Sequence, residues 1–117
     1  MHDFVGKWRI TEMELWAQDM VDMNELGNFD FYDNNQGRLA FCAVEGWLDV
    51  CVSHRMPEME FSWEGTDSGR PVSGRGKIEF ETPFIGYGKL FIHNGDCSTF
   101  SINRIEQNTP DKVVSLR

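Results

Sequence analysis

The sequence of residues 4–16 is FVGKWRITEMELW. Its aromatic and β-branched residues are typical of a strand, and we expect this stretch to begin a β-sheet. The alternation is imperfect, because Trp8 and Ile10 share one phase whereas Met13 lies in the other. Either a bulge near Thr11 switches the phase of the strand, or the strand is continuous and turns two carboxylates towards the interior.

Those two carboxylates belong to Glu12 and Glu14. If both point inward near Tyr87 or His93, they form a polar ligand site or an acid–base pair with shifted pKa values. If the bulge forms, both return to solvent. Burying two unpaired carboxylates costs several kcal/mol, so the cost of burial favours the bulge.

Further strand patterns follow along the chain. The clearest alternates Ile78 and Phe80 with charged residues, which is the period of a half-buried strand. Gly46 is expected to separate two strands, and residues 66–73 are expected to form the longest irregular loop, because glycine and proline are frequent there. The expected strands after the first span residues 28–33, 38–44, 47–53, 59–65, 75–81, 87–93 and 97–105.

About eight short strands joined by short turns predict an all-β fold, arranged as an antiparallel up-and-down meander. The meander closes as a small barrel or folds as a sandwich, and closure is favoured because it removes edge strands. One short helix is expected after the first strand, where Asp19 can cap it and Gly27 can end it. A single domain is expected over residues 1–117, with 106–117 as a loose tail.

The formal net charge is −8, and most of the excess acid lies in residues 10–64, where Arg38 and Arg55 are the bases. Nucleic-acid binding and adsorption to anionic membranes both use clustered Lys and Arg, and the sequence contains no such cluster. We therefore expect neither nucleic acid nor membrane as a partner.

Cys42, Cys51 and Cys97 are an odd number of cysteines in a chain whose first residues contain no apolar signal-peptide run. We expect reduced thiols that pack as small buried hydrophobes, and a cytoplasmic location. The sequence has no membrane-span pattern and no zinc-type Cys/His spacing, so neither a metal nor another cofactor is expected.

The Gly-x-Trp sequence from Gly6 to Trp8 resembles the calycins, the superfamily of lipocalins and fatty-acid-binding proteins. The resemblance implies a calycin-like barrel in which an arginine near the end of the last strand packs over the tryptophan. Arg104 shares a phase with Phe100 and Ile102, so it is the implied structural partner of Trp8 through a cation–π contact. The phrases GKWRITEMELW, EFSWEG and SGRG also resemble a set of small uncharacterised bacterial proteins.

Five residues are candidates for a ligand site. His93 precedes a turn and lies near an acid, which suits either a general base or a polar surface residue. The aromatic residues of uncertain phase either pack in the core or line a surface for a partner or a dimer. These aromatic residues are Trp16, Trp47, Tyr87 and Phe91, and the five site candidates are Glu12, Glu14, Trp47, Tyr87 and His93.

Two groups of charged residues are expected to be ordinary surface features rather than binding sites. Asp22 and Glu25 are expected on the solvated face of the short helix, because their spacing lacks the ligand order of a calcium loop. Arg70 and Arg75 lie among Ser-Gly pairs that could hold a phosphate, and they are expected in a mobile connecting loop.

The sequence therefore favours a non-enzymatic binding module for a small molecule or a protein partner. Two alternatives stay open. One is a small enzyme that uses Glu12, Glu14 and His93 for acid–base chemistry, which requires the three side chains to converge. The other is a structural homodimer formed through exposed aromatic side chains.

Overall fold

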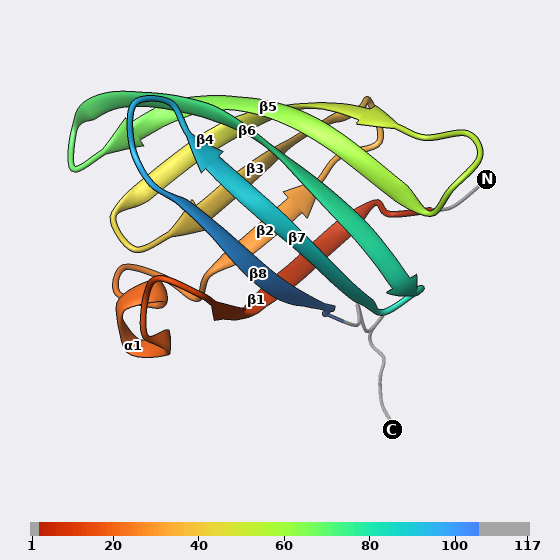
Figure 1. Cartoon of the computed structure of the whole chain (residues 1–117), viewed down its shortest axis with the longest axis horizontal. Coiled ribbons are helices and arrows are strands. Elements are labelled where there is room, and N and C mark those ends of the chain that lie inside the picture. Colours follow the sequence, from red (N-terminus) through yellow and green to blue (C-terminus); the bar gives the residue numbers. More distant parts are fainter. Residues whose placement is uncertain (1–2, 106–117) are drawn as a thin grey trace.

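The first strand closes the sheet on itself in the computed structural model, which describes residues 3–105. This strand, β1 (Gly6–Met13), pairs with β2 (Asn28–Phe31) on one side and with β8 (Cys97–Arg104) on the other, so eight antiparallel strands form a closed up-and-down barrel (Figure 1). The other strands are β3 (Gln36–Phe41), β4 (Val44–Val52), β5 (Glu58–Asp67), β6 (Arg70–Thr82) and β7 (Ile85–Ile92).

A bulge in β1 determines the direction in which the carboxylates of Glu12 and Glu14 point. Ile10 pairs with Ile102, whereas Glu12 pairs with Ser101, so the register shifts by one residue between them. Met13 is consequently buried, and Glu12 is exposed on the outer face together with the following glutamate. The bulge was therefore the correct alternative, and the interior-carboxylate alternative was wrong.

Aromatic rings fill much of the barrel interior, and glycines on neighbouring strands make room for them. The Trp63 ring lies across Gly46 on β4 and Gly74 on β6, and the Phe61 ring lies against Gly76. Large and small residues alternate in this way in small barrels, whose interior is narrow. Further buried rings belong to Phe4, Trp8, Phe29, Phe31, Phe41, Phe80 and Phe100.

Two expected boundaries were wrong. Gly46 does not separate two strands: the turn falls at Cys42, where φ is 53°, and β4 runs through the glycine. Residues 66–73 do not form a loop either, because Ser68 and Gly69 make a two-residue turn with φ of 52° and 86°. Gly46 is a strand residue that faces the Trp63 ring, but in the sequence such a glycine resembles a turn signal.

Trp8 joins the first and last strands at the end of the barrel where β1 begins. The Arg104 guanidinium lies 5.0 Å from the centroid of the Trp8 ring, which is the contact implied by the calycin resemblance. The same guanidinium donates hydrogen bonds to the carbonyl oxygens of Asp3, Val5 and Pro83. Trp8 Nε1 donates to the Phe4 carbonyl at 3.1 Å, so the N-terminal segment is bound by one residue from each of the two strands that close the barrel.

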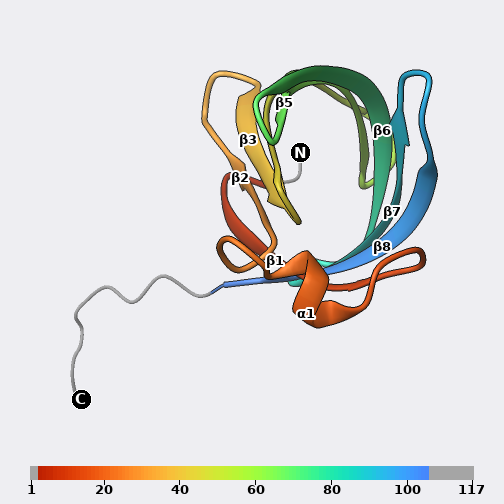
Figure 2. The same cartoon turned by 90° about the vertical axis from the view of Figure 1, so that its left-hand side faces the viewer.

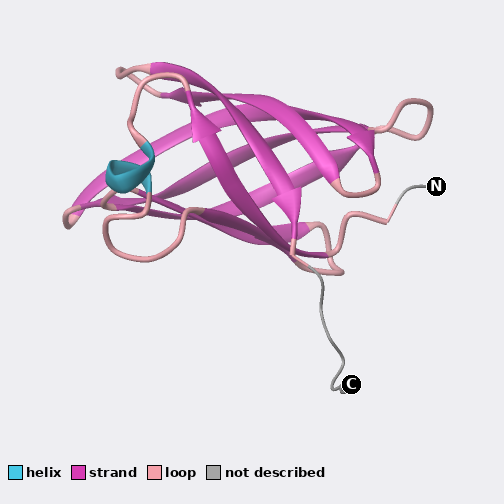
Figure 3. Cartoon of the chain, turned by 90° about the horizontal axis from the view of Figure 1, so that it is seen from below, coloured by secondary structure: helices cyan, strands magenta, loops and turns pink. Residues whose placement is uncertain are grey.

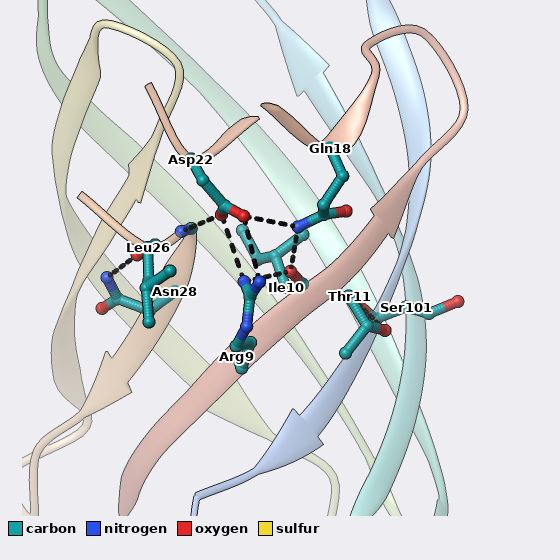
Figure 4. A network of polar contacts seen from close by, with 9 residues as sticks. Arg9, Ile10, Thr11, Gln18, Asp22, Leu26, Asn28 and Ser101 are labelled. Carbon is teal, nitrogen blue, oxygen red and sulfur yellow. Dashed lines mark hydrogen bonds and ion pairs between the residues drawn. The ribbon is translucent and has the colours of Figure 1, made fainter. Parts of the chain in front are cut away.

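The opposite end carries the short helix α1 (Gln18–Val21), which was expected after the first strand. Figure 2 and Figure 3 show it lying at this end of the strands. Arg9 on β1 makes an ion pair with Asp22 at 3.0 Å, and Gln18 Nε2 donates to the Ile10 carbonyl (Figure 4). The buried Val21 side chain then packs against the barrel.

The segment after α1 is held by a second arginine. Arg38 on β3 bonds both carboxylate oxygens of Glu25, at 2.7 and 3.1 Å, and also bonds Glu45 at 2.8 Å. This contact lowers the pKa of Glu25. Asp22 and Glu25 are therefore not on a solvated helix face as expected, because each accepts hydrogen bonds from an arginine of the barrel.

The stability of this end is expected to fall in acid. The hydrogen bond from Arg9 lowers the pKa of Asp22 from 3.8 to about 2. Because the pKa is lower in the folded state, the ion pair contributes fully above about pH 4, and its contribution is lost as the pH falls from about 4 to about 2. For a partly exposed pair we expect a contribution of about 1 kcal/mol.

Chemical denaturation of the native chain and of Asp22→Asn between pH 6 and pH 2 measures this contribution. Other acids, Glu25 included, titrate in both proteins, so the difference between the two curves isolates Asp22. The two should differ by about 1 kcal/mol near pH 6 and converge near pH 2. A difference that stays constant over this range would contradict the assignment.

Candidate ligand-binding sites

A groove crosses the outer face of the barrel over strands β4 to β7. Its volume is about 870 Å³. Trp47 on β4 and Phe91 on β7 rise on either side, with 51% and 41% of their surfaces exposed. We call this feature the outer groove; its outward-facing side chains are Tyr32, Gln36, Trp47, Asp49, Ser62, Glu64, Ser73, Arg75, Phe91 and His93.

Arginines lie against both aromatic walls of the outer groove. The Arg38 guanidinium is 6.0 Å from the centroid of the Trp47 ring, and Arg38 is itself fixed by its two carboxylate partners. The Arg75 guanidinium lies 4.9 Å from the centroid of the Phe91 ring. Cation–π contacts of this length orient both rings. Each contact favours the observed position of its ring by about 0.5–1 kcal/mol.

The floor of the outer groove is polar and is built by strand register. Asp49 pairs with Ser62 across β4 and β5, and Glu64 pairs with Ser73 across β5 and β6. The His93 backbone donates a hydrogen bond to the Ser73 carbonyl at 2.8 Å, which fixes the histidine beside β6. Short serines between longer side chains produce the hollow.

A second hollow opens at the barrel end where β1 begins. This mouth pocket has a volume of about 750 Å³. Inward-facing Val50 and Val52 are half-buried there, whereas Met59 beside them is buried. Apolar residues from the strands thus reach solvent at the mouth, with two aspartates at the rim. The full lining is Asp3, Phe4, Val5, Phe31, Tyr32, Asp33, Asn35, Gln36, Val50, Cys51, Val52, Ser53, His54 and Met59.

The structure brings together two of the five residues predicted for a ligand site. Trp47 and His93 both line the outer groove. Glu12 and Tyr87 lie elsewhere on the outer face, each paired with Ser101 of β8. Glu81 raises the pKa of the exposed Tyr87 phenol by charge repulsion and by a hydrogen bond.

Glu14 lies apart from His93. Its carboxylate accepts hydrogen bonds from the Thr99 backbone and hydroxyl at 3.3 and 3.4 Å. Thr99 pairs with Lys89, and His93 is four residues further along the chain, which is about 13 Å in an extended strand. The convergence required for acid–base chemistry by Glu12, Glu14 and His93 is not present.

Other expectations for the surface also changed. Trp16 is half-buried and packs against Phe41, so it is not part of an exposed aromatic face. Cys51 and Cys97 are exposed, in contrast to the buried thiols expected. Cys42 is half-buried, and burial raises the pKa of its thiol. Alternation along a strand could have placed Cys51 outside, because it shares the phase of Trp47.

Sequence reasoning did not assemble Asp49, Ser62 and Glu64 into a site. Nothing in their own segments marks them, since each is an ordinary outward-facing strand residue. Arg75 was expected at the start of the strand 75–81 and among Ser-Gly pairs that could hold phosphate, but not beside Phe91. The signal that unites them is the register of four strands, which pairs residues from distant parts of the sequence.

Within residues 3–105, no three Cys, His, Asp or Glu side chains converge as a metal site would require. In the same range, no helix has the length and apolar character needed to cross a membrane. The expected tail at 106–117 lies outside the described residues.

Comparison with known proteins found no matching family model, no matching curated protein and no matching solved structure. The interpretation of the two hollows therefore depends on their own geometry and chemistry.

Proposed function

We propose that the protein is a non-enzymatic binding module of the calycin type, and that its mouth pocket takes a small, neutral and mainly apolar molecule. The observation that carries the proposal is the pair of half-buried valines, Val50 and Val52, which present inner-face apolar surface at the open mouth. A volume of about 750 Å³ lies in the usual range for small-ligand sites, which are mostly apolar with a few polar groups.

Calycin membership is supported by three features together. The barrel is an eight-stranded up-and-down meander, a short helix follows the first strand, and Arg104 packs over Trp8. The mouth pocket lies at the end where this closing pair is found, beside the N-terminal segment that Arg104 binds.

The charge of the mouth favours a neutral ligand over a fatty acid. Asp3 and Asp33 lie at the rim, and the chain has a net charge of −8. An anionic head group would meet repulsion at the rim, whereas an alcohol or an uncharged ring system would not. This is a departure from the fatty-acid-binding branch of the superfamily, whose ligands are carboxylates.

Filling the mouth is expected to abolish binding. Val52→Trp places a large ring in the pocket, and the affinity for the neutral fluorophore Nile red should fall by at least about tenfold. Val72→Trp is the matched control, because Val72 is also a half-buried valine of the core, on β6, and does not line the mouth pocket. Fluorescence titration measures both variants and the native chain.

Two outcomes would overturn the proposal. One is a native chain that does not bind Nile red or dodecanol, as followed by fluorescence and by competition. The other is binding that Val52→Trp and Val72→Trp reduce equally. A native chain that binds dodecanoate more tightly than dodecanol would contradict the preference for a neutral ligand.

A further inference from the structure

The outer groove is a second site, distinct in lining and in chemistry from the mouth pocket. Its walls are aromatic faces, its floor is polar, and it is open along its length. Tyr32 and Gln36 are the residues that the two hollows share.

The walls suit a ligand with flat apolar faces and polar edges. An exposed aromatic ring packs against C–H groups through dispersion and weak C–H contacts with its π face, and a sugar ring presents such C–H faces while its hydroxyls project at the edge. Trp47 on β4 and Phe91 on β7 are three strands apart, and Phe91 aligns with Arg75, two residues beyond the Ser73 that aligns with Trp47. Their backbones are therefore separated by about 16 Å along the sheet, a span that suits an oligosaccharide rather than a single sugar ring.

The floor can donate and accept hydrogen bonds. Asp49 and Glu64 are acceptors, whereas Arg75 is a donor. Within residues 3–105, the side chains of these three residues make no hydrogen bond or ion pair; the contact of Arg75 is with the Phe91 ring. Because a hydroxyl both donates and accepts, a ligand rich in hydroxyls satisfies all of them.

The mixed charge of the floor disfavours ionic ligands. A phosphate or a nucleic acid would meet the carboxylates of Asp49 and Glu64, and a cation would meet the guanidinium of Arg75. The same two carboxylates and the guanidinium act as directional hydrogen-bond partners for an uncharged ligand. Charge complementarity thus selects a neutral, polar molecule.

A peptide strand has no edge to join on this barrel. Each strand of the described barrel pairs with a neighbour on both sides, including β1 with β8. Strand addition, the common way in which sheets take up extended peptides, needs a free edge. We propose that the outer groove binds a neutral oligosaccharide, with sugar rings against Trp47 and Phe91 and hydroxyls on Asp49, Glu64 and Arg75.

The test begins with the full chain on an array of neutral and charged glycans, followed by titration of the glycans retained. Trp47 is 51% exposed, Trp8 and Trp63 are almost fully buried, and the half-buried Trp16 lies outside the outer groove, so a bound sugar should change the tryptophan emission chiefly through Trp47. Trp47→Ala and Phe91→Ala should each weaken binding by at least about tenfold, as expected when an aromatic contact at the centre of a site is removed.

Tyr87→Ala is the matched control, because Tyr87 is an outward-facing aromatic of β7, 49% exposed, that lies outside the outer groove. Its affinity should equal that of the native chain. Val52→Trp should also leave glycan binding unchanged, so a failure of the mouth-pocket proposal is distinguishable from a failure here.

Three results would overturn the assignment: no glycan retained by the native chain, retention that Trp47→Ala leaves unchanged, or Trp47-dependent binding of anionic glycans or peptides in preference to neutral glycans. Circular dichroism of each variant, showing the spectrum of the native chain, establishes that a lost affinity reflects the lost ring and not a lost fold.

Discussion

Gly74→Ala is expected to destabilise the barrel by about 3 kcal/mol or more. A methyl group on Gly74 would overlap the Phe91 carbonyl oxygen across the β6–β7 pair and would come within 2.8 Å of Trp63 Nε1. The carbonyl belongs to the backbone of a paired strand and cannot rotate away. Relief therefore requires the two strands to separate or the Trp63 ring to move within a closely packed core, and overpacking of this kind is costly.

A glycine in a turn supplies the control for this prediction. Gly69 has φ of 86°, and a methyl group there would meet no atom within 4 Å. Gly69→Ala should therefore cost about 1 kcal/mol, through backbone strain alone. Guanidinium unfolding followed by tryptophan fluorescence compares the two variants. A Gly74→Ala protein within about 1 kcal/mol of the native chain would show that the interior is packed more loosely than described.

The sequence alone was sufficient to predict the strands whose two faces differ in polarity. Ile78 and Phe80 on β6 and Phe61 and Trp63 on β5 alternate with charged or polar residues, and all four are buried. Alternation identifies the inner face because a residue and its neighbour point to opposite sides of the sheet. The number of strands follows from the same pattern, whereas closure was favoured because it removes edge strands, and the short helix because Asp19 can cap it and Gly27 can end it.

The glycines of the inner face explain why the boundaries were missed. Glycine is frequent in turns, and a local interpretation takes Gly46 and Gly74 as breaks between strands. In the barrel, both glycines leave room for the Trp63 ring, which belongs to the strand between theirs. That neighbour is known only once the register of β4, β5 and β6 is known, so no local pattern in the sequence contains this information.

The outer groove illustrates the same limit for a site. Trp47 was predicted as a ligand-binding residue although its phase was uncertain, and the structure places it on the outer face of β4. Its association with Arg75 and Phe91 depends on three strand pairings and on the two-residue turn at Ser68 and Gly69. Arg75 was expected to begin the strand at 75–81, but the register of that strand with its neighbours could not be read from the sequence, so the guanidinium was not placed beside the Phe91 ring.

Substitutions of Trp8 and Arg104, the pair that joins the first and last strands, should have the other large effect on stability. Trp8 is fully buried, its ring meets Phe80 at 5.0 Å between centroids, and its indole nitrogen is hydrogen-bonded. Trp8→Ala should cost about 3–5 kcal/mol, which is much of the 5–15 kcal/mol that typically stabilises a domain. Trp8→Phe, which keeps a ring, provides a measurable variant if the alanine protein does not fold.

Arg104 acts on Trp8 and on the backbone at once, so its effect should not be additive with that of the tryptophan. Arg104→Leu removes the cation–π contact and the charged donors to the carbonyls of Asp3, Val5 and Pro83, and we expect a loss of about 2–3 kcal/mol. A double-mutant cycle with Trp8→Phe should give a coupling energy of at least about 0.5 kcal/mol.

Arg104→Lys separates charge from geometry in this cycle. Lysine keeps the positive charge but cannot reach three carbonyls with a planar fork, so it should recover only part of the lost stability. Simple additivity of Trp8→Phe and Arg104→Leu would mean that the arginine only fastens the N-terminal segment. Coupling would mean that the first and last strands are joined through these two side chains, so that Gly6 to Trp8 contributes to closing the barrel as well as to beginning it.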